Sequence, residues 1–214
     1  MLFEKGQKIV FAGDSVTDDG RKRPIGEGLG EGVGKGFVRL VDTFLTVDYP
    51  ELMLRVVNMG NAGDTSADLL ARWDSDVTAL KPDWVVLCIG FNDVWRQFDC
   101  PTQPDLAVSP EEYRKNLNDM ANKTDANMIW MTPYYLEANR NDAMRAKMDE
   151  YGAIMKEEAG KRGIICVDLQ AAFTDILKHR YPAFITWDRV HPSWIGSMII
   201  ARALLKIVGF EMKS

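Results

Sequence analysis

Residues 8–15 read Lys-Ile-Val-Phe-Ala-Gly-Asp-Ser, a short apolar run that ends in a glycine, an acid and a serine. The run is continuously apolar rather than alternating, which is typical of a strand covered on both faces, as in a parallel sheet. Similar runs recur along the chain and predict four more strands. These lie at residues 54–58, 84–89, 128–131 and 164–167.

Segments with helical periodicity lie between and after these runs. The expected helices span residues 37–47, 66–80, 110–123, 143–162, 169–178 and 194–208. Alternation of strand and helix predicts an α/β fold, a three-layer α/β/α sandwich with a five-stranded parallel sheet and right-handed crossovers. No repeat or Pro/Ser-rich linker divides the chain, so we expect a single domain over residues 1–214.

Composition restricts the classes of partner. The chain has 26 basic and 31 acidic residues and a formal charge of −5, which disfavours binding to nucleic acid. No segment reaches the roughly 20 apolar residues of a membrane-spanning helix. Residues 1–8 also lack the apolar stretch of a signal peptide. We therefore expect no membrane partner and a cytoplasmic location.

The cysteines and glycines give little sign of a bound group. Cys88, Cys100 and Cys166 lack metal-ligand spacing, so we expect free thiols, and we expect no metal and no organic cofactor. The glycine-dense segment 20–36 predicts a long ordered loop over the carboxyl edge of the sheet, where ligands bind in open α/β folds. A nucleotide site within it is disfavoured, because residues 28–32 lack the strand-to-helix context and lysine of phosphate-binding loops.

Ser15 follows the first predicted strand directly and so lies at this carboxyl edge. A serine at such a turn is either a nucleophile or simply a helix cap or turn former. The choice depends on a base, because a serine hydroxyl is a weak nucleophile at neutral pH. His179 lies among basic residues at a helix end, where a solvated cation is the ordinary explanation. His191 is the better candidate, since Asp188 precedes it by three residues on one loop and is able to orient its ring.

Two further segments end strands at the same edge. Residues 58–65 contain Gly63 in a glycine-rich turn, and residues 90–93 contain Asn92. Backbone N–H groups in such a turn and an asparagine amide are suitable donors to the oxyanion of acyl transfer. Each segment alone has a plainer explanation, a helix-capping turn for the first and an Asx turn for the second. Together with the Ser15 and His191 segments, they make four segments expected at strand ends, and this coincidence favours a serine hydrolase.

The four segments, taken together, resemble the motif blocks of the SGNH, or GDSL-type, hydrolase family. The blocks occur in the family order, as Gly-Asp-Ser at 13–15, Gly63, Gly-Phe-Asn-Asp at 90–93 and Asp-Arg-Val-His-Pro at 188–192. The resemblance implies a flavodoxin-like fold and a Ser15, Asp188 and His191 triad. It also implies an oxyanion hole made by the Ser15 and Gly63 amides and the Asn92 side chain. Val16 departs from the leucine of the family name, but the Gly-Asp-Ser core is intact.

A closer resemblance extends to the intracellular acetylxylan esterases of this family. It is carried by the glycines and arginines of residues 20–28, by Asn-Asp-Val-Trp-Arg-Gln at 92–97 and by Trp-Asp-Arg-Val-His-Pro at 187–192. Such enzymes remove acetyl groups from xylo-oligosaccharides and can form ring-like homo-octamers. The resemblance therefore implies an acetylated sugar substrate and a homo-oligomer.

Side chains near the motifs are candidates for substrate binding. Trp95 and Trp187 are expected to line the cleft and pack against sugar faces, although buried packing is the commoner use of tryptophan. Asp14 and Arg96 are further candidate substrate contacts. Arginines, including Arg21 and Arg23, suit either substrate hydroxyls or subunit contacts, and both alternatives stay open.

The sequence therefore predicts a serine esterase that acts on short acyl esters through an acyl-enzyme intermediate. Acetyl is favoured over a fatty chain because no extended apolar lid is evident. The alternative is a non-catalytic carbohydrate-binding or assembly protein on the same scaffold, in which Ser15 and His191 are structural.

Overall fold

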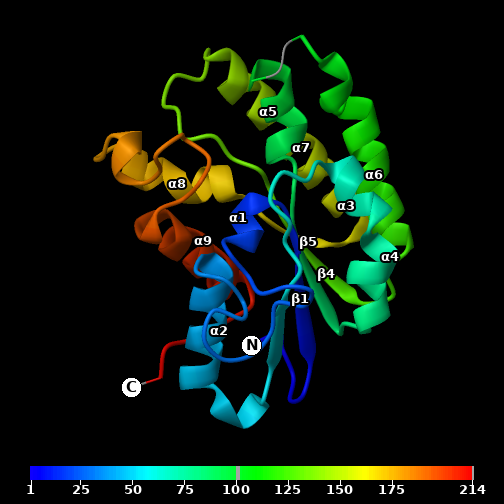
Figure 1. Ribbon diagram of the computed structural model, residues 1–214. Coiled ribbons are helices and arrows are strands. Elements are labelled where there is room, and N and C mark those ends of the chain that lie inside the picture. The colour runs from blue at the N-terminus through cyan, green and yellow to red at the C-terminus, as the bar shows by residue number, and fades with distance from the viewer. Residues whose placement is uncertain (100–101, 214) are drawn as a thin grey trace.

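A computed structural model describes residues 1–99 and 102–213 of the chain. Its centre is a five-stranded parallel sheet in the order β2-β1-β3-β4-β5, the flavodoxin-like order (Figure 1). The strands are β1 (Lys8–Gly13), β2 (Arg55–Asn58), β3 (Trp84–Cys88), β4 (Asn127–Met131) and β5 (Ile165–Val167). All five predicted strands are present, and the predicted α/β sandwich is confirmed.

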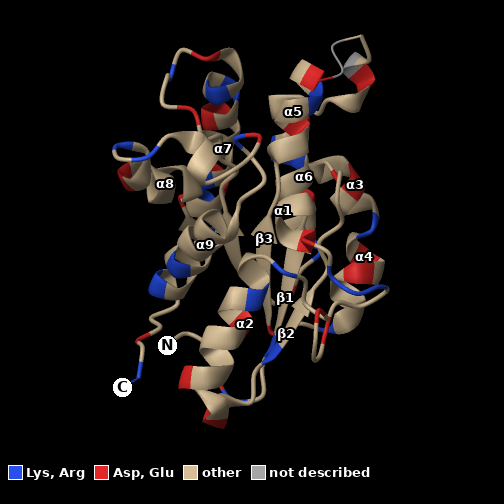
Figure 2. Ribbon diagram, turned by 60° about the vertical axis from the view of Figure 1, so that its left-hand side comes forward, with Lys and Arg blue, Asp and Glu red and all other residues tan. Residues whose placement is uncertain are grey.

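β1 is an interior strand of the sheet, and both of its faces are apolar. Ile9, Val10 and Phe11 are completely buried, and β1 pairs with β2 on one side and with β3 on the other. The charged residues in Figure 2 lie mostly on helices and loops and rarely on strands, as expected for a sheet covered on both faces. Burial of this kind is the main stabilising contribution to the fold.

Helices cover the two faces of the sheet. They are α1 (Ser15–Asp18), α2 (Phe37–Asp48), α3 (Ser66–Ala71), α4 (Trp73–Asp76), α5 (Phe91–Asp99), α6 (Pro110–Asn122), α7 (Ala143–Arg162), α8 (Leu169–Leu177) and α9 (Trp194–Ile207). On one face α9 packs against α2 and α8, and on the other α6 packs against α3 and α7 (Figure 1). Within the described ranges, no helix combines the length and apolar character that crossing a membrane requires.

The continuous helix expected over residues 66–80 is wrong. The segment divides into α3, α4 and a 3₁₀ turn at Thr78–Leu80. At the first break the Arg72 guanidinium donates to Asp64 and to the Gly13 carbonyl, while the Trp73 ring is fully buried and its indole N–H bonds to Thr124. These contacts with distant segments outweigh the local helical pattern.

Two other segments complete the comparison with the sequence. Residues 20–36 contain no helix or strand, and a single bridge joins Gly26 to Asn58, so the predicted long loop is confirmed. The sequence did not predict α5 as a helix, because its nine residues contain mainly polar side chains and give only a short apolar pattern. Cys88 and Cys166 form no disulfide with any described residue, and Cys100 lies outside the described residues.

Candidate functional site

Ser15 is the first residue of α1 and follows the end of β1 by two residues. The Asp14 carboxylate caps α1 by accepting the Val16 N–H at 3.0 Å. The turn is tight, because a Cβ atom on Gly13 would lie 2.2 Å from the Cys88 carbonyl oxygen on β3. Glycine is therefore required beside Ser15, and the serine is held at the carboxyl edge of the sheet, as the sequence predicted.

Ser15, His191 and Asp188 form one continuous hydrogen-bonded chain. The Ser15 Oγ lies 2.7 Å from His191 Nε2, and His191 Nδ1 lies 2.6 Å from Asp188 Oδ2. The serine and the histidine are 176 residues apart in the sequence. The fold thus brings the three predicted triad residues together in the order that a serine nucleophile requires.

Backbone geometry fixes the loop that carries the acid and the base. A bridge between Thr186 and Pro192 closes the loop just before α9. One oxygen of Asp188 accepts the Val190 N–H at 3.0 Å and the His191 N–H at 2.7 Å. Partial burial opposes ionisation of Asp188, but the His191 ring and these N–H groups hold its pKa below the ordinary value. The carboxylate is therefore ionised at neutral pH and suited to orient an imidazole.

The predicted donors for an oxyanion belong to three segments of the chain. Among the described residues, the N–H groups of Ser15 and Gly63 have no hydrogen-bond acceptor. Gly63 has φ +91°, in the left-handed region that favours glycine. The Asn92 amide donates one hydrogen to the Asp64 carbonyl at 2.9 Å, which leaves its second hydrogen for a ligand. Thr65 caps α3 through a capping box, so the capping explanation of this segment is confirmed, and the oxyanion role of Gly63 stays a prediction.

Two tryptophans flank the ring of His191. The Trp187 ring is stacked on it with the centroids 5.5 Å apart and the planes 11° apart, and the half-buried Trp95 ring lies 5.6 Å away in a tilted arrangement. Trp187 is 81% exposed and lines a pocket of about 340 Å³ together with Tyr135, Tyr181 and Asp188. Both tryptophans therefore lie at the site, and the face of Trp187 is open to solvent.

Two of the residues considered for substrate contact do not reach the surface. Asp14 is completely buried, and burial raises the pKa of its carboxyl well above the ordinary value. Arg21 is 7% exposed, and its guanidinium donates to the carbonyls of Gly60, Lys22 and Pro24. The prediction that Asp14 binds substrate is therefore wrong, and Arg21 is a structural residue that holds the long loop.

The other two arginines considered for substrate contact, Arg23 and Arg96, have acidic partners. Arg23 pairs with Asp18 at 2.5 Å, and Arg96 pairs with Asp99 at 2.5 Å on α5. Both guanidinium groups are partly exposed, so they retain free donor groups. A substrate role for Arg96 stays a prediction.

Several residues that support the site carry little recognisable signal in the sequence. Asp18 accepts the Ala62 N–H at 3.0 Å, next to Gly63, and Thr186 donates to Asp188 at 3.1 Å. Asp93 accepts the Ser66 N–H. In the sequence, Asp93 is recognisable only as the last residue of the Gly-Phe-Asn-Asp segment. The adjacency of Asp93 to Asn92 was the available signal, but its partner Ser66 lies 27 residues away and is not visible from spacing.

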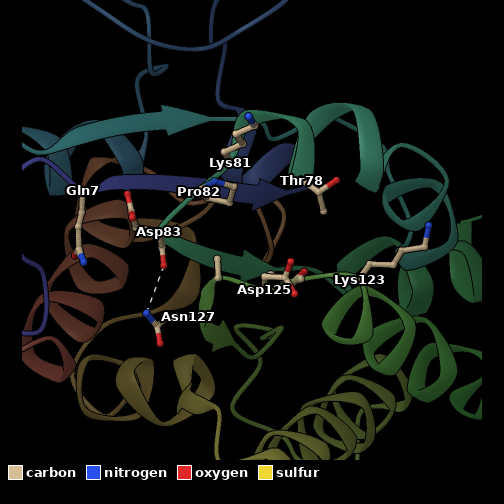
Figure 3. A pocket seen from close by; sticks show the side chains of 10 residues that line it. Gln7, Thr78, Lys81, Pro82, Asp83, Lys123, Asp125 and Asn127 are labelled. Atoms are coloured by element: carbon tan, nitrogen blue, oxygen red, sulfur yellow. Dashed lines mark hydrogen bonds between the residues drawn. The ribbon is translucent and has the colours of Figure 1, made fainter.

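A second pocket lies at the opposite edge of the sheet, where β1, β3 and β4 begin (Figure 3). Its volume is about 410 Å³, and Gln7, Lys81, Asp83 and Asn127 lie around it. It contains none of the triad residues and no histidine or cysteine. The predicted triad therefore lies at the carboxyl edge of the sheet, away from this pocket. In the part of the chain that the structure describes, no group of three or more His, Cys, Asp or Glu side chains is placed to hold a metal ion.

Comparison with known proteins agrees with this geometry. An acetylxylan esterase from Geobacillus stearothermophilus is 49% identical over 214 residues, which cover 99% of this chain and 98% of that protein. A crystal structure of a catalytic mutant of the acetylxylan esterase Axe2 from this organism matches with a TM-score of 0.97 and 48% identity over 100% of both chains. LAE5, an alpha/beta hydrolase enzyme from the metagenome of Lake Arreo, Spain, matches with a TM-score of 0.95 and 48% identity over 98% of both chains.

More distant similarity points the same way. Esterase TesA from Pseudomonas aeruginosa is 32% identical over 123 residues, 56% of this chain and 49% of that protein. The family model of the GDSL-like Lipase/Acylhydrolase family matches residues 11–199, a range that contains the serine, both oxyanion segments and the histidine loop. On the sequence match and on the arrangement of these four segments at one sheet edge, the chain belongs to the GDSL-like Lipase/Acylhydrolase family.

Proposed function

We propose that this chain is a serine esterase that removes acetyl groups from xylo-oligosaccharides. The observation that carries the proposal is the unbroken chain from Ser15 Oγ through the His191 ring to Asp188, with contacts of 2.7 and 2.6 Å. A serine in this arrangement is activated as a nucleophile. The full-length similarity to an acetylxylan esterase supports the choice of substrate class.

The proposed reaction has two acyl-transfer steps. Ser15 Oγ attacks the ester carbonyl carbon as its proton passes to His191 Nε2, and the carbonyl oxygen becomes an oxyanion. The oxyanion receives hydrogen bonds from the Ser15 N–H, the Gly63 N–H and the Asn92 amide. Collapse of this intermediate breaks the bond between the acyl carbon and the sugar oxygen, and His191 donates its proton to that oxygen, which leaves as a sugar hydroxyl.

The second step releases the acid. Water attacks the acetyl-serine while His191 takes one of its protons, and a second oxyanion forms in the same place. Collapse returns the proton to Ser15 and frees acetate. Because His191 must be neutral to accept a proton, the acid limb of the activity profile is expected to follow its protonation.

A sugar ester fits the surroundings of the histidine. The open face of Trp187 offers a flat apolar surface of the kind that packs against the apolar face of a sugar ring. The adjoining pocket also contains the hydroxyl of Tyr135 and the guanidinium of Arg189, which are hydrogen-bonding groups for sugar hydroxyls. We therefore place the sugar along the Trp187 side of the cleft and the acetyl group at Ser15.

The proposal is tested by hydrolysis of 4-nitrophenyl acetate and of acetylated xylo-oligosaccharides. Wild-type protein is compared with Ser15→Ala and with Ser75→Ala, which alters an exposed serine on α4 as a matched control. We expect wild type and Ser75→Ala to turn over both substrates and Ser15→Ala to turn over neither. Turnover of the activated ester alone would keep the mechanism and reject the xylan substrate. Binding of oligosaccharide without any turnover would instead support the non-catalytic carbohydrate-binding protein.

Three further proposals concern the whole molecule. We propose one domain over residues 1–214, a homo-oligomer and a cytoplasmic location. Large apolar side chains exposed near the triad loop support self-association, among them Tyr181, Phe184 and Trp194 at 66%, 66% and 67% exposure. Light scattering that detected only a 24.1 kDa species would contradict the oligomer. Two separate unfolding transitions would contradict the single domain.

A further inference from the structure

The three oxyanion donors belong to three separate segments, so their spacing depends on contacts between those segments. Ser15 lies on α1, Gly63 on the loop after β2, and Asn92 on α5. Asp18 on α1 joins the first two by accepting the Ala62 N–H at 3.0 Å. The spacing between Gly63 and Asn92 needs a separate link, because an oxyanion hole loses its effect when its donors move by about 1 Å.

Asp93 provides that second link. Its carboxylate lies on α5 and accepts the N–H of Ser66, the first residue of α3, at 3.0 and 3.1 Å. It also accepts the Ser66 hydroxyl. The Asn92 amide bonds to the Asp64 carbonyl at 2.9 Å, two residues before Ser66. The start of α5 is therefore fastened to the start of α3 at two adjacent points, both within three residues of Gly63.

A carboxylate suits this position for a physical reason. Its two oxygens accept an N–H and an O–H together, whereas an asparagine amide has only one acceptor atom and adds donors that face the Ser66 N–H. The Ser66 hydroxyl is itself fixed, since it accepts the Asn116 amide from α6 at 3.0 Å. The network lies in the interior, where Asp93 and Ser66 are fully buried.

Burial of this carboxyl is costly. It raises the pKa of Asp93 to about 7 although Ser66 hydrogen bonds favour the charged form. An apolar pair would fill the same space without desolvating an acid. A buried acid at this place is therefore better explained by positioning of the neighbouring donors than by stability.

We propose that Asp93 is a positioning residue of the oxyanion hole, which holds Ser66 so that the Gly63 N–H and the Asn92 amide keep their spacing. The proposal rests on the serine esterase function proposed above. Asp93 does not touch the substrate. It acts through the Asp64–Ser66 backbone on one side and through its neighbour Asn92 on the other.

The test compares an ester with its thiono analogue, in which sulfur replaces the carbonyl oxygen. Sulfur is larger and a weaker hydrogen-bond acceptor, so turnover of 4-nitrophenyl thionoacetate depends little on the oxyanion hole. In Asp93→Asn, kcat for 4-nitrophenyl acetate is expected to fall with little change in KM. The ratio of oxo-ester to thiono-ester turnover is expected to fall about tenfold or more.

Asp68→Asn is the matched control. Asp68 also accepts hydrogen bonds at the start of α3, from the Thr65 N–H and hydroxyl, but it makes no hydrogen bond to α5. Its variant is expected to lose stability and to keep the oxo-to-thiono ratio. Equal losses on both esters in Asp93→Asn, or an equal ratio change in Asp68→Asn, would overturn the positioning role.

A second variant decides the question if Asp93→Asn does not fold. Ser66→Ala removes the hydroxyl bond to Asp93 and keeps the backbone N–H bond, so a smaller fall of the same ratio is expected. An unchanged ratio in Ser66→Ala would then reject the proposal. If the wild type turned over both esters and the variants kept its oxo-to-thiono ratio, only this inference would be rejected. One that turned over neither ester would reject the esterase function and this inference with it.

Discussion

Asp188 and Asp93 both lie near Ser15 and both accept backbone N–H groups, but they lie in opposite environments. Asp188 is partly open to solvent and faces the His191 ring, and its pKa is held below the ordinary value. Asp93 is fully buried and forms no salt bridge within residues 1–99 and 102–213, and burial raises its pKa to about 7. The outer carboxylate is therefore suited to remain charged beside the His191 ring, and the inner one is suited to hold neighbouring backbone segments in position.

The largest effect is expected from the outer carboxylate. Asp188→Asn keeps the shape of the loop but favours the wrong tautomer of His191, so kcat is expected to fall roughly 10⁴-fold. Asp168→Asn is a matched control, because Asp168 is also a half-buried acid with a lowered pKa, but it caps α8 and pairs with Lys156. Steady-state kinetics on 4-nitrophenyl acetate measure both. Similar losses in the two variants would refute a special role for Asp188.

The next effect concerns a donor next to the inner carboxylate. Asn92→Ala removes one oxyanion donor, and kcat is expected to fall about 10²–10³-fold with little change in KM. Asn118→Ala removes a half-buried amide on α6, far from the triad in the fold, and is expected to leave kcat unchanged. A loss that appeared in KM rather than in kcat would contradict an oxyanion role for Asn92.

The two carboxylates are also expected to give opposite dependence of stability on pH. An unfolded aspartate titrates near pH 3.9, so folding takes up a proton at Asp93 between about pH 4 and pH 7. The contribution of Asp93 to the unfolding free energy therefore falls as pH rises through this window. Asparagine does not titrate, so the unfolding free energy of wild type minus that of Asp93→Asn is expected to fall by roughly 2 kcal/mol from pH 5 to pH 7.

The sign is reversed for Asp188. Its lowered pKa means that its contribution is complete above the ordinary pKa and is lost only as pH falls below it. The difference between wild type and Asp188→Asn is therefore expected to be flat from pH 5 to pH 7. Denaturant unfolding at several pH values measures both differences. The same slope for both variants would show that the environments of the two acids do not differ as described.

The smallest effect is expected at Trp187, the exposed tryptophan that stacks on His191. Trp187→Ala removes the ring stacked on His191, and KM for acetylated xylo-oligosaccharides is expected to rise about two- to tenfold. KM for 4-nitrophenyl acetate, which has no sugar, should change less. Trp194→Ala removes another exposed tryptophan and serves as the control. Equal changes for both substrates would exclude a sugar contact at Trp187.

The amino-acid sequence was sufficient to predict the architecture and to propose a location for the site. Continuous apolar runs report strands buried on both faces, and glycines such as Gly13 and Gly63 report tight or left-handed backbone. Both patterns are local, so they can be recognised in the sequence without knowledge of the fold. The order of the four motif segments then placed Ser15 and His191 at one edge, before any contact between them was known.

Tertiary contacts determine which polar side chains are exposed near Ser15 and which are buried beneath the site. Asp14 and Arg21 resemble surface residues in the sequence, but both are buried, and the expected helix over residues 66–80 breaks where Arg72 binds distant carbonyls. The link from Asp93 to Ser66 is equally invisible. The burial and hydrogen bonding of these groups depend on segments that come into contact only in the folded chain. The spacing of residues along the sequence does not reveal those contacts.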